Sequence, residues 1–450
     1  MNKINQAQNA AIKTQQTHLK RILGIGFGLA IVIGGSVGMG ILRMPALVAG
    51  YTTNPYIYIS LWIAGGLISL IGASVYAEMG TRFPSAGGPF VYAQNAMGDK
   101  YGFITGWANW IFIAGVLAYL SIAISEYTNK LLGITLPVGM LSSLFIILLA
   151  VIQWRSIQLS SNFQKIMSTL KAVVLLLLVI ACFIYFFTHG HYAQNENSDP
   201  VATPLLPAII LSLRAIYMTY GGWNSAVYFT EEDTHPEKNL PRSLIWGVIS
   251  IMIIFVLVNL GLIAVLPLEK IAASKLPAAD AAQIIFGGNG NTIVTIISII
   301  SLLGILNAVL LFAPRILFAI ARAGLFFKSI ANLNKHSIPG NALILTTLVA
   351  VLFASTGLFT LVLNLAALLT ILVDLSVYVS IFFVRSKKRF AAPPYKAWAY
   401  PYSAIIMVLI TLGLVIGLFF EDTLNSIYSL LILALAFPFY FLFKRMSGQT

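Results

Sequence analysis

The amino-acid sequence predicts an all-α polytopic membrane protein. Hydrophobic residues make up 59% of its 450 residues and charged residues only 9%, whereas a soluble globular protein has about 25% charged residues. Apolar stretches of about 18 residues or more, the length that crosses a bilayer as a helix, recur along the whole chain. We therefore expect a single membrane domain in which lipid surrounds a bundle of helices.

Hydropathy along the chain predicts about twelve spanning segments. We place them at residues 21–50, 55–80, 101–127, 136–154, 162–187, 206–229, 243–266, 292–321, 342–355, 358–384, 398–420 and 423–443. Lysine and arginine gather at alternate segment ends, and such residues stay on the cytoplasmic side. This alternation remains in phase only with twelve segments. It predicts a multi-pass protein of the cell membrane with both termini in the cytoplasm.

Composition also bears on several classes of partner. The net charge of +13 comes from residues at segment ends, where they act as topology signals and lipid contacts, which disfavours a nucleic-acid partner. Cys182 is the single cysteine, and the five histidines lie in the N-terminal tail or near loops, so we expect neither a metal site nor a cofactor. Residues 1–19 are polar and predict a disordered cytoplasmic tail.

Two glycine-rich runs interrupt otherwise apolar segments. The first segment has four glycines within seven positions, Gly34 to Gly40, and the sixth contains Gly221 and Gly222 mid-span. Each glycine costs a helix interior roughly 1 kcal/mol relative to alanine. Backbone unwound at membrane depth is tolerated where it is buried in protein or lines a cavity, and its freed N–H and C=O groups can bind a ligand.

Paired interruptions at corresponding places of two halves are a pointer to a transporter's substrate site. If segments one to five and six to ten form two repeats, the offset of five gives them opposite orientations and matches segment one with segment six. The units are then a tail (1–19), a first repeat (20–189), an extracellular loop (190–205), a second, inverted repeat (206–384), and helices eleven and twelve with a cytoplasmic C-terminus (385–450).

The polarity of the breaks suits a zwitterion. A helix that restarts after Gly38 leaves unpaired N–H groups and a partial positive charge, which favour a carboxylate. Helix ends that stop before the gaps leave unpaired carbonyls, which favour an ammonium group. The alternative is that these glycines only allow helices to pack closely, as small residues do in membranes.

The motifs at these breaks carry a family resemblance. Gly38-Met39-Gly40-Ile41, followed by Pro45, resembles the first-helix motif of the amino acid, polyamine and organocation superfamily. The run from Tyr220 to Asn224, followed by Thr230-Glu231-Glu232, is similar to the sixth-helix signature of its L-type amino acid transporter branch. The resemblance implies a LeuT-like five-plus-five inverted repeat with helices one and six broken, two extra helices, and alternating access.

The resemblance also implies the site residues. The substrate carboxylate would meet the amides of Val37, Gly38, Met39 and Gly40. The substrate ammonium would meet carbonyls near Ser36 and at Met218 and Gly221. The side-chain pocket would include Met218, Trp223 and Asn224, beside Tyr220 and Gly222. Met39 departs from the family, which often has a small hydroxyl residue there, so it would narrow or reshape the pocket.

Ionisable residues within the segments need separate explanations. Lys171 lies about nine residues into segment five, so about 13 Å deep at 1.5 Å per residue, and an intramembrane charge indicates function. The resemblance implies a built-in cation where sodium-coupled relatives hold an ion; the alternative is snorkelling to the surface. For Asp374, Glu78 and Glu126 we expect helix-end or packing roles rather than proton transfer.

These features favour a secondary transporter of amino acids, most simply neutral L-amino acids, working without sodium as an exchanger or facilitator. A proton-coupled symporter or a carrier of polyamines or other cations is the alternative, although no acidic residue lies within one helical turn of either break in the sequence. A membrane enzyme would need paired carboxylates or an activated nucleophile at membrane depth. A nutrient sensor that binds without transport stays open, as does a partner subunit.

Overall fold

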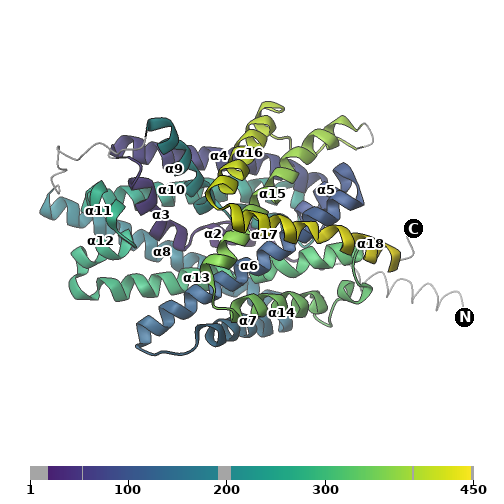
Figure 1. Cartoon of the computed structure of the whole chain (residues 1–450), viewed down its shortest axis with the longest axis horizontal. Coiled ribbons are helices and arrows are strands. Elements are labelled where there is room, and N and C mark those ends of the chain that lie inside the picture. The colour runs from purple at the N-terminus through teal and green to yellow at the C-terminus, as the bar shows by residue number, and fades with distance from the viewer. Residues whose placement is uncertain (1–18, 53, 191–203, 388–389, 447–450) are drawn as a thin grey trace, which may run out of the picture.

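The computed structural model describes residues 19–52, 54–190, 204–387 and 390–446. Within these ranges the protein is a bundle of helices (Figure 1), and its only β pairing is an isolated bridge between Leu23 and Asp233. The all-α fold class is therefore confirmed. The predicted tail and most of the predicted extracellular loop, at residues 1–18 and 191–203, lie outside the described residues.

The chain runs through the following elements. They are α2 (Ile25–Ser36), α3 (Met39–Ala49), α4 (Pro55–Arg82), α5 (Pro89–Met97), α6 (Asp99–Leu132), α7 (Val138–Arg155), α8 (Ile157–His189), α9 (Leu205–Tyr220), the 3-10 helix η1 (Trp223–Phe229), α10 (Pro236–Val265), α11 (Leu268–Ala273), α12 (Pro277–Phe286), η2 (Gly287–Asn289), α13 (Gly290–Arg322), η3 (Lys328–Ala331), α14 (Gly340–Ser355), α15 (Phe359–Ser386), α16 (Tyr402–Glu421), α17 (Thr423–Ala434) and α18 (Ala436–Met446).

Every predicted segment coincides with a helix or a helix pair. Among the described residues, nine helical stretches are long and apolar enough to cross a membrane, and the bent pair of α2 and α3 makes a tenth. The remaining two segments correspond to α9 and α14, which have 16 residues each. A helix needs about 20 residues to span a bilayer upright. The count of twelve crossings and the inverted repeat therefore remain predictions.

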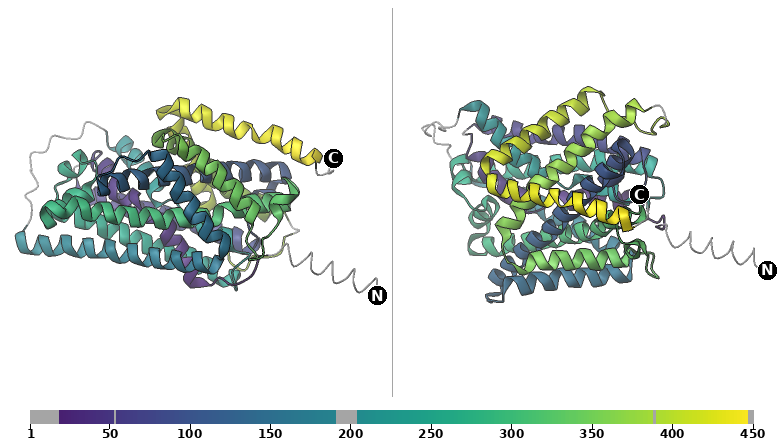
Figure 2. Two further views of the ribbon diagram at one scale, coloured as in Figure 1. Left: turned by 90° about the horizontal axis from the view of Figure 1, so that it is seen from below. Right: turned by 45° about the vertical axis from the view of Figure 1, so that its right-hand side comes forward.

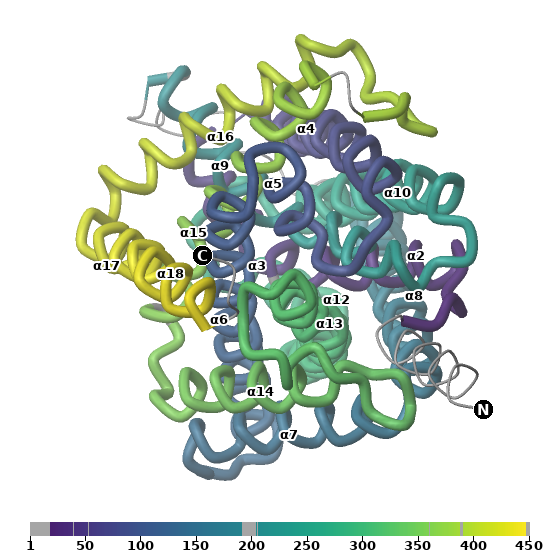
Figure 3. Tube along the Cα trace, turned by 90° about the vertical axis from the view of Figure 1, so that its right-hand side faces the viewer, coloured from purple at the N-terminus to yellow at the C-terminus, as the bar shows by residue number. Residues whose placement is uncertain are grey.

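Long helices from the two predicted halves pack against each other at the centre. Helix α6 contacts both α13 and α15, and α10 contacts α4, α2 and α8. Figures 2 and 3 show α17 and α18 along one flank of this bundle and the paired α7 and α14 along another. Within the bundle, α2 packs against α8, α10, α13 and η1, and α3 packs against α9.

Local sequence signals set several helix starts. Asn54 caps α4 by accepting hydrogen bonds from the amides of Tyr56 (2.9 Å) and Ile57 (3.3 Å), which satisfies two of the first-turn donors. Ser156 caps α8 in the same way. Helix α8 therefore begins at residue 157, five residues before the predicted start of segment five, and Lys171 lies about 21 Å along it at 1.5 Å per residue.

Helix α5 was not expected, because its residues fall in what the sequence indicates as a loop after segment two. Pro89 occupies its first turn, where the missing N–H costs nothing. Phe90, Tyr92 and Ala96 are buried, and α5 packs against α6 and α15. Burial of this apolar face explains why a short segment forms a helix here.

Candidate functional site

The first break separates α2 from α3. Helix α2 ends at Ser36, Val37 is extended with φ −73° and ψ 109°, and α3 begins at Met39. The two helices are bent by 45° relative to each other. The Val37 amide still donates to Ile33 O at 2.9 Å, so it belongs to the last turn of α2. This narrows the predicted carboxylate site to the amides that follow it.

The second break separates α9 from η1 and lies against the first. Gly222 has φ 98°, a conformation that side chains disfavour. A Cβ atom at Gly222 would lie 2.4 Å from Gly35 O, and one at Gly35 would lie 2.9 Å from Gly222 O. Neither position accepts a side chain without moving backbone. The two glycine-rich runs are therefore in direct contact, as the sequence predicts for a shared site.

The polar groups at this junction have opposite polarity. The first-turn amides of α3, beginning with Met39 and Gly40, have no acceptor within their own helix. Met218 O accepts from Gly221 N at 3.2 Å and has a second lone pair free for another donor. Ser36 Oγ is buried, and among the described residues it has no hydrogen-bond partner. Buried polar groups of this kind normally have partners.

Lys171 reaches the first break from α8. Its side chain is 0% exposed, and Nζ donates to Gly34 O at 2.6 Å and to Val37 O at 2.7 Å. The ammonium thus satisfies carbonyls at the end of α2 that a continuous helix would have paired with the next turn. This geometry excludes snorkelling. It places the Lys171 amino group at the first break.

The remaining predicted site residues divide into two groups. Gly221 is exposed, and Gly40, Met218 and Gly222 are half-buried, so their groups are accessible at the junction. Tyr220 is instead fully buried, and its hydroxyl donates to Trp62 O at 2.9 Å. Tyr220 therefore braces α9 against α4.

Trp223 and Asn224 turn toward α4 and α15. The Trp223 ring packs edge-on against Tyr76 with centroids 5.2 Å apart. Asn224 Nδ2 donates to Asp374 Oδ1 at 3.5 Å. These two residues therefore link the start of η1 to α4 and α15.

Close packing also explains part of the first glycine run. A Cβ atom at Gly34 would lie 2.2 Å from Gln164 Nε2 and 2.4 Å from Ser168 Oγ, both on α8. Gly34 is thus a packing glycine, whereas Gly35 and Gly222 let the two breaks meet. Close packing thus accounts for glycine at these positions, and the role of the breaks in binding a ligand stays a prediction.

For Glu78, Asp374 and Glu126 the expectation is a helix-end or packing role, and the structure places them differently. Glu126 is exposed on α6. Glu78 fits that expectation, because it accepts from the Arg385 guanidinium (2.9 and 2.5 Å) and from Ala397 N (2.7 Å). Asp374 instead lies beside the second break, where it accepts from Tyr76 Oη at 2.5 Å and from Tyr217 Oη at 2.9 Å. It is distant from Gly221 in sequence, so no local pattern could place it there.

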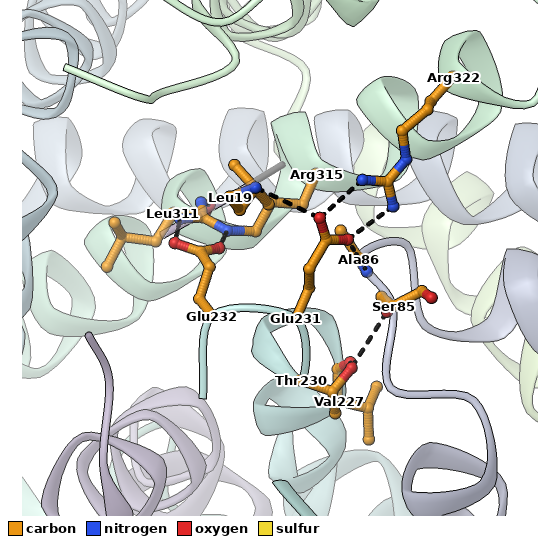
Figure 4. Close-up of polar contacts among 10 residues, drawn as sticks. All are labelled: Leu19, Ser85, Ala86, Val227, Thr230, Glu231, Glu232, Leu311, Arg315 and Arg322. Carbon is orange, nitrogen blue, oxygen red and sulfur yellow. Dashed lines mark hydrogen bonds and ion pairs between the residues drawn. The ribbon is translucent and has the colours of Figure 1, made fainter. Parts of the chain in front are cut away.

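A cluster of ion pairs follows the C-terminal end of η1 (Figure 4). We call Glu231, Glu232, Arg315 and Arg322 the glutamate latch. Arg322 donates to both carboxylate oxygens of Glu231 at 2.6 Å each. Arg315 pairs with both oxygens of Glu232, and these two side chains are almost completely buried. The latch joins the segment after η1 to α13.

Backbone amides from two other segments also donate hydrogen bonds to Glu231 and Glu232. Glu231 also accepts from Ala86 N at 2.9 Å and from Leu19 N at 3.3 Å. Burial alone would raise the pKa of Glu231, but hydrogen bonds and the charge of Arg322 outweigh it, and the pKa lies below its usual value. Glu232 O accepts from the amides of Ile22 and Leu23 at 3.0 Å each. The sequence motif Thr230-Glu231-Glu232 flagged this segment but gave no partner for it.

Comparison with known proteins decides the family. The model of a family described as amino acid permease matches residues 27–443. The chain belongs to this amino acid permease family. The superfamily that the two broken-helix motifs predict is therefore confirmed.

Curated relatives of this amino acid permease are also transporters. It is 27% identical over 319 residues to the serine/threonine exchanger SteT of Bacillus subtilis, covering 68% of this chain and 70% of that protein. It is 25% identical over 439 residues to the human b(0,+)-type amino acid transporter 1, covering 95% and 88%. It is 26% identical over 348 residues to the rabbit large neutral amino acids transporter small subunit 2, covering 75% and 65%.

Proposed function

We propose that this permease moves neutral L-amino acids across the cell membrane by alternating access, as a sodium-independent exchanger or facilitator. The observation that carries the proposal is the contact between the two helix breaks. The first turn of α3 also packs against the end of α9, since a Cβ atom at Gly40 would lie 3.1 Å from Thr219 Cγ2, next to the Met218 carbonyl. The α-carboxylate and α-ammonium of an amino acid match the opposite polarities of the α3 amides and the Met218 carbonyl.

The junction suits a zwitterion because it needs no charged side chain to hold either group. An unpaired buried charge costs several kcal/mol in a membrane interior. Backbone dipoles avoid that cost, because they are already fixed in the fold. Gly38, Met39 and Gly40 are the amides proposed for the carboxylate, and Met218 and Gly221 the carbonyls proposed for the ammonium group.

Lys171 supports independence from sodium. Its ammonium occupies the carbonyls of Gly34 and Val37, and carbonyl oxygens are the ligands that a sodium ion would use. With a covalently attached cation already there, substrate binding needs no ion from solution. Sodium should therefore have no effect on uptake.

The glutamate latch supports alternating access. In the predicted orientation it lies at the cytoplasmic end of η1, where we propose that it blocks access to the junction from the cytoplasm. Transport requires these contacts to break in one half of the cycle and to re-form in the other. The exchanger named among the relatives, and the one named for large neutral amino acids, point to the same mode and substrate class.

Radiolabelled amino-acid uptake into proteoliposomes tests the proposal. Vesicles preloaded with a panel of unlabelled amino acids are compared with empty vesicles, with and without sodium or a pH gradient. We expect uptake to be stimulated by internal neutral amino acids and to be unaffected by sodium. Binding without counterflow would instead identify a sensor, and uptake driven by the pH gradient would identify a symporter. If no amino acid supports uptake, the proposal fails.

A further inference from the structure

Asp374 connects both halves of the second broken helix. Its Oδ2 accepts from Tyr217, in the last turn of α9, at 2.9 Å, and its Oδ1 accepts from Asn224, at the start of η1, at 3.5 Å. The break at Gly221 and Gly222 lies between these two donors. One carboxylate on α15 thus spans the break.

A third donor fixes the carboxylate from α4. Tyr76 Oη donates to Asp374 Oδ1 at 2.5 Å, and the Tyr76 ring packs against Trp223, the first residue of η1. Asp374 is 6% exposed, and no lysine, arginine or histidine of the described residues forms an ion pair with it. Three neutral donors hold this charge in place of a counter-ion.

Lys171 likewise holds the first break with hydrogen bonds from a buried side chain. It lies fourteen residues after the first residue of α8, and Asp374 lies fifteen residues after the first residue of α15. Helices α8 and α15 are the fifth helices of the two predicted repeats. Each predicted repeat therefore places one buried charge, from the middle of its last helix, against the break in its first helix.

The sign of each charge matches what its break offers. At the first break the partners are carbonyl oxygens, which only accept, so a donor-only ammonium suits them. At the second break the partners are two hydroxyls and an amide, which donate, so an acceptor-only anion suits them. Charge-assisted hydrogen bonds are about twice as strong as neutral ones.

We propose that Asp374 is a positioning residue that holds α9 and η1 at the angle needed for substrate binding, as the counterpart of Lys171. It acts through Tyr217 and Asn224 and does not itself touch the substrate. The inference rests on the proposed function, because it assigns Asp374 to the same site.

This role has a kinetic signature. Without the carboxylate, only a fraction of the molecules hold the break in its binding geometry, and the apparent affinity falls by that fraction. Saturating substrate selects the competent molecules again. The substrate concentration at half-maximal exchange should therefore rise about tenfold on loss of one such bond, while the maximal exchange rate should change less than about twofold.

The test compares Asp374→Asn, Tyr217→Phe and their combination in proteoliposome exchange with the amino acid that the wild-type protein transports best. We expect each single variant to raise the half-saturation concentration about tenfold, and the double variant to add little, because both remove the same link. Tyr92→Phe is the matched control. Tyr92 lies on α5, its ring packs edge-on against the Tyr76 ring, and its buried hydroxyl has no hydrogen-bond partner among the described residues.

Three results would overturn the inference. If Asp374→Asn abolishes binding while Tyr217→Phe does not alter it, the carboxylate contacts the substrate directly. If both variants melt at lower temperature but keep the wild-type half-saturation concentration, the role is only structural. If the maximal rate falls at unchanged half-saturation, the link acts on a later step. Failure of the wild-type protein to exchange any amino acid would instead reject the proposed function.

Discussion

The sharpest test of the first break is the substitution Lys171→Met, which keeps an unbranched chain of similar length but removes the ammonium group. Lys171 Nζ is the hydrogen-bond partner of Gly34 O and Val37 O. Without it both carbonyls face an apolar neighbour. The polarity of the carbonyls does not change, so the backbone of the break must move to find other donors.

The magnitude follows from these two bonds. A buried carbonyl left without a partner costs about 1–3 kcal/mol, so two of them cost about 2–6 kcal/mol. Removing the ammonium also removes its own cost of burial, which is several kcal/mol, so we take the lower end of that range. A loss of about 2 kcal/mol in the binding geometry corresponds to roughly a 30-fold weaker affinity.

Equilibrium binding of a radiolabelled amino acid to purified protein measures this effect. The matched control is Lys165→Met, because Lys165 is an exposed lysine on the same helix. We expect the control to bind as the wild-type protein does, and Lys171→Met to bind at least 30-fold more weakly at an unchanged elution profile. Wild-type affinity in a folded Lys171→Met protein would refute the assignment of Lys171 to the break.

Three further predictions concern the second break and the latch. Gly222→Ala should abolish binding, since Gly222 has φ 98° and its Cβ atom would lie 2.4 Å from a backbone oxygen. Gly413→Ala is the control, because the space around Gly413 is open, and it should not alter binding. Equal binding by both variants would contradict the contact of the two breaks. Arg315→Met should destabilise the protein by about 3–5 kcal/mol, because it leaves Glu232 buried and unpaired, and a melting temperature within error of the wild type would argue against the pair. Because the folded state lowers the pKa of Glu231, its contribution to stability is complete above its ordinary value of 4.5 and is lost as the pH falls through the lower folded-state value; thermal melting below pH 4.5 should show this decline in the wild type and less of it in Glu231→Gln.

The sequence predicted the spanning helices and both breaks because these depend on local composition. Apolar length determines the helices, and glycine clusters determine where they fail. Lys171 was found for the same reason, since a single lysine in an apolar run has no trivial explanation. Its partners could not be predicted, because the carbonyls it binds are more than 130 positions away along the chain.

Asp374 shows where sequence reasoning stopped. In the sequence, no acidic residue lies within one helical turn of either break. The packing of α15 against α4 brings Asp374 to the second break from 150 positions away. The same limit applies to the latch: the two glutamates form a sequence motif, but their partners Arg315 and Arg322 lie more than 80 positions away on α13. Helix α5 is not predicted because it has only nine residues, too few to stand out in the hydropathy of the chain.

Main-chain hydrogen bonds, as well as the ion pairs of the latch, hold the segment that follows η1. Ile22 and Leu23 donate to Glu232 O, and Thr234 N donates to Leu23 O at 2.9 Å. Main-chain bonds of this kind survive any exchange of side chains except proline. Variants that delete a latch charge therefore leave a main-chain attachment in place, and Leu23→Pro would remove one of its three main-chain bonds, the one that Leu23 N donates to Glu232 O.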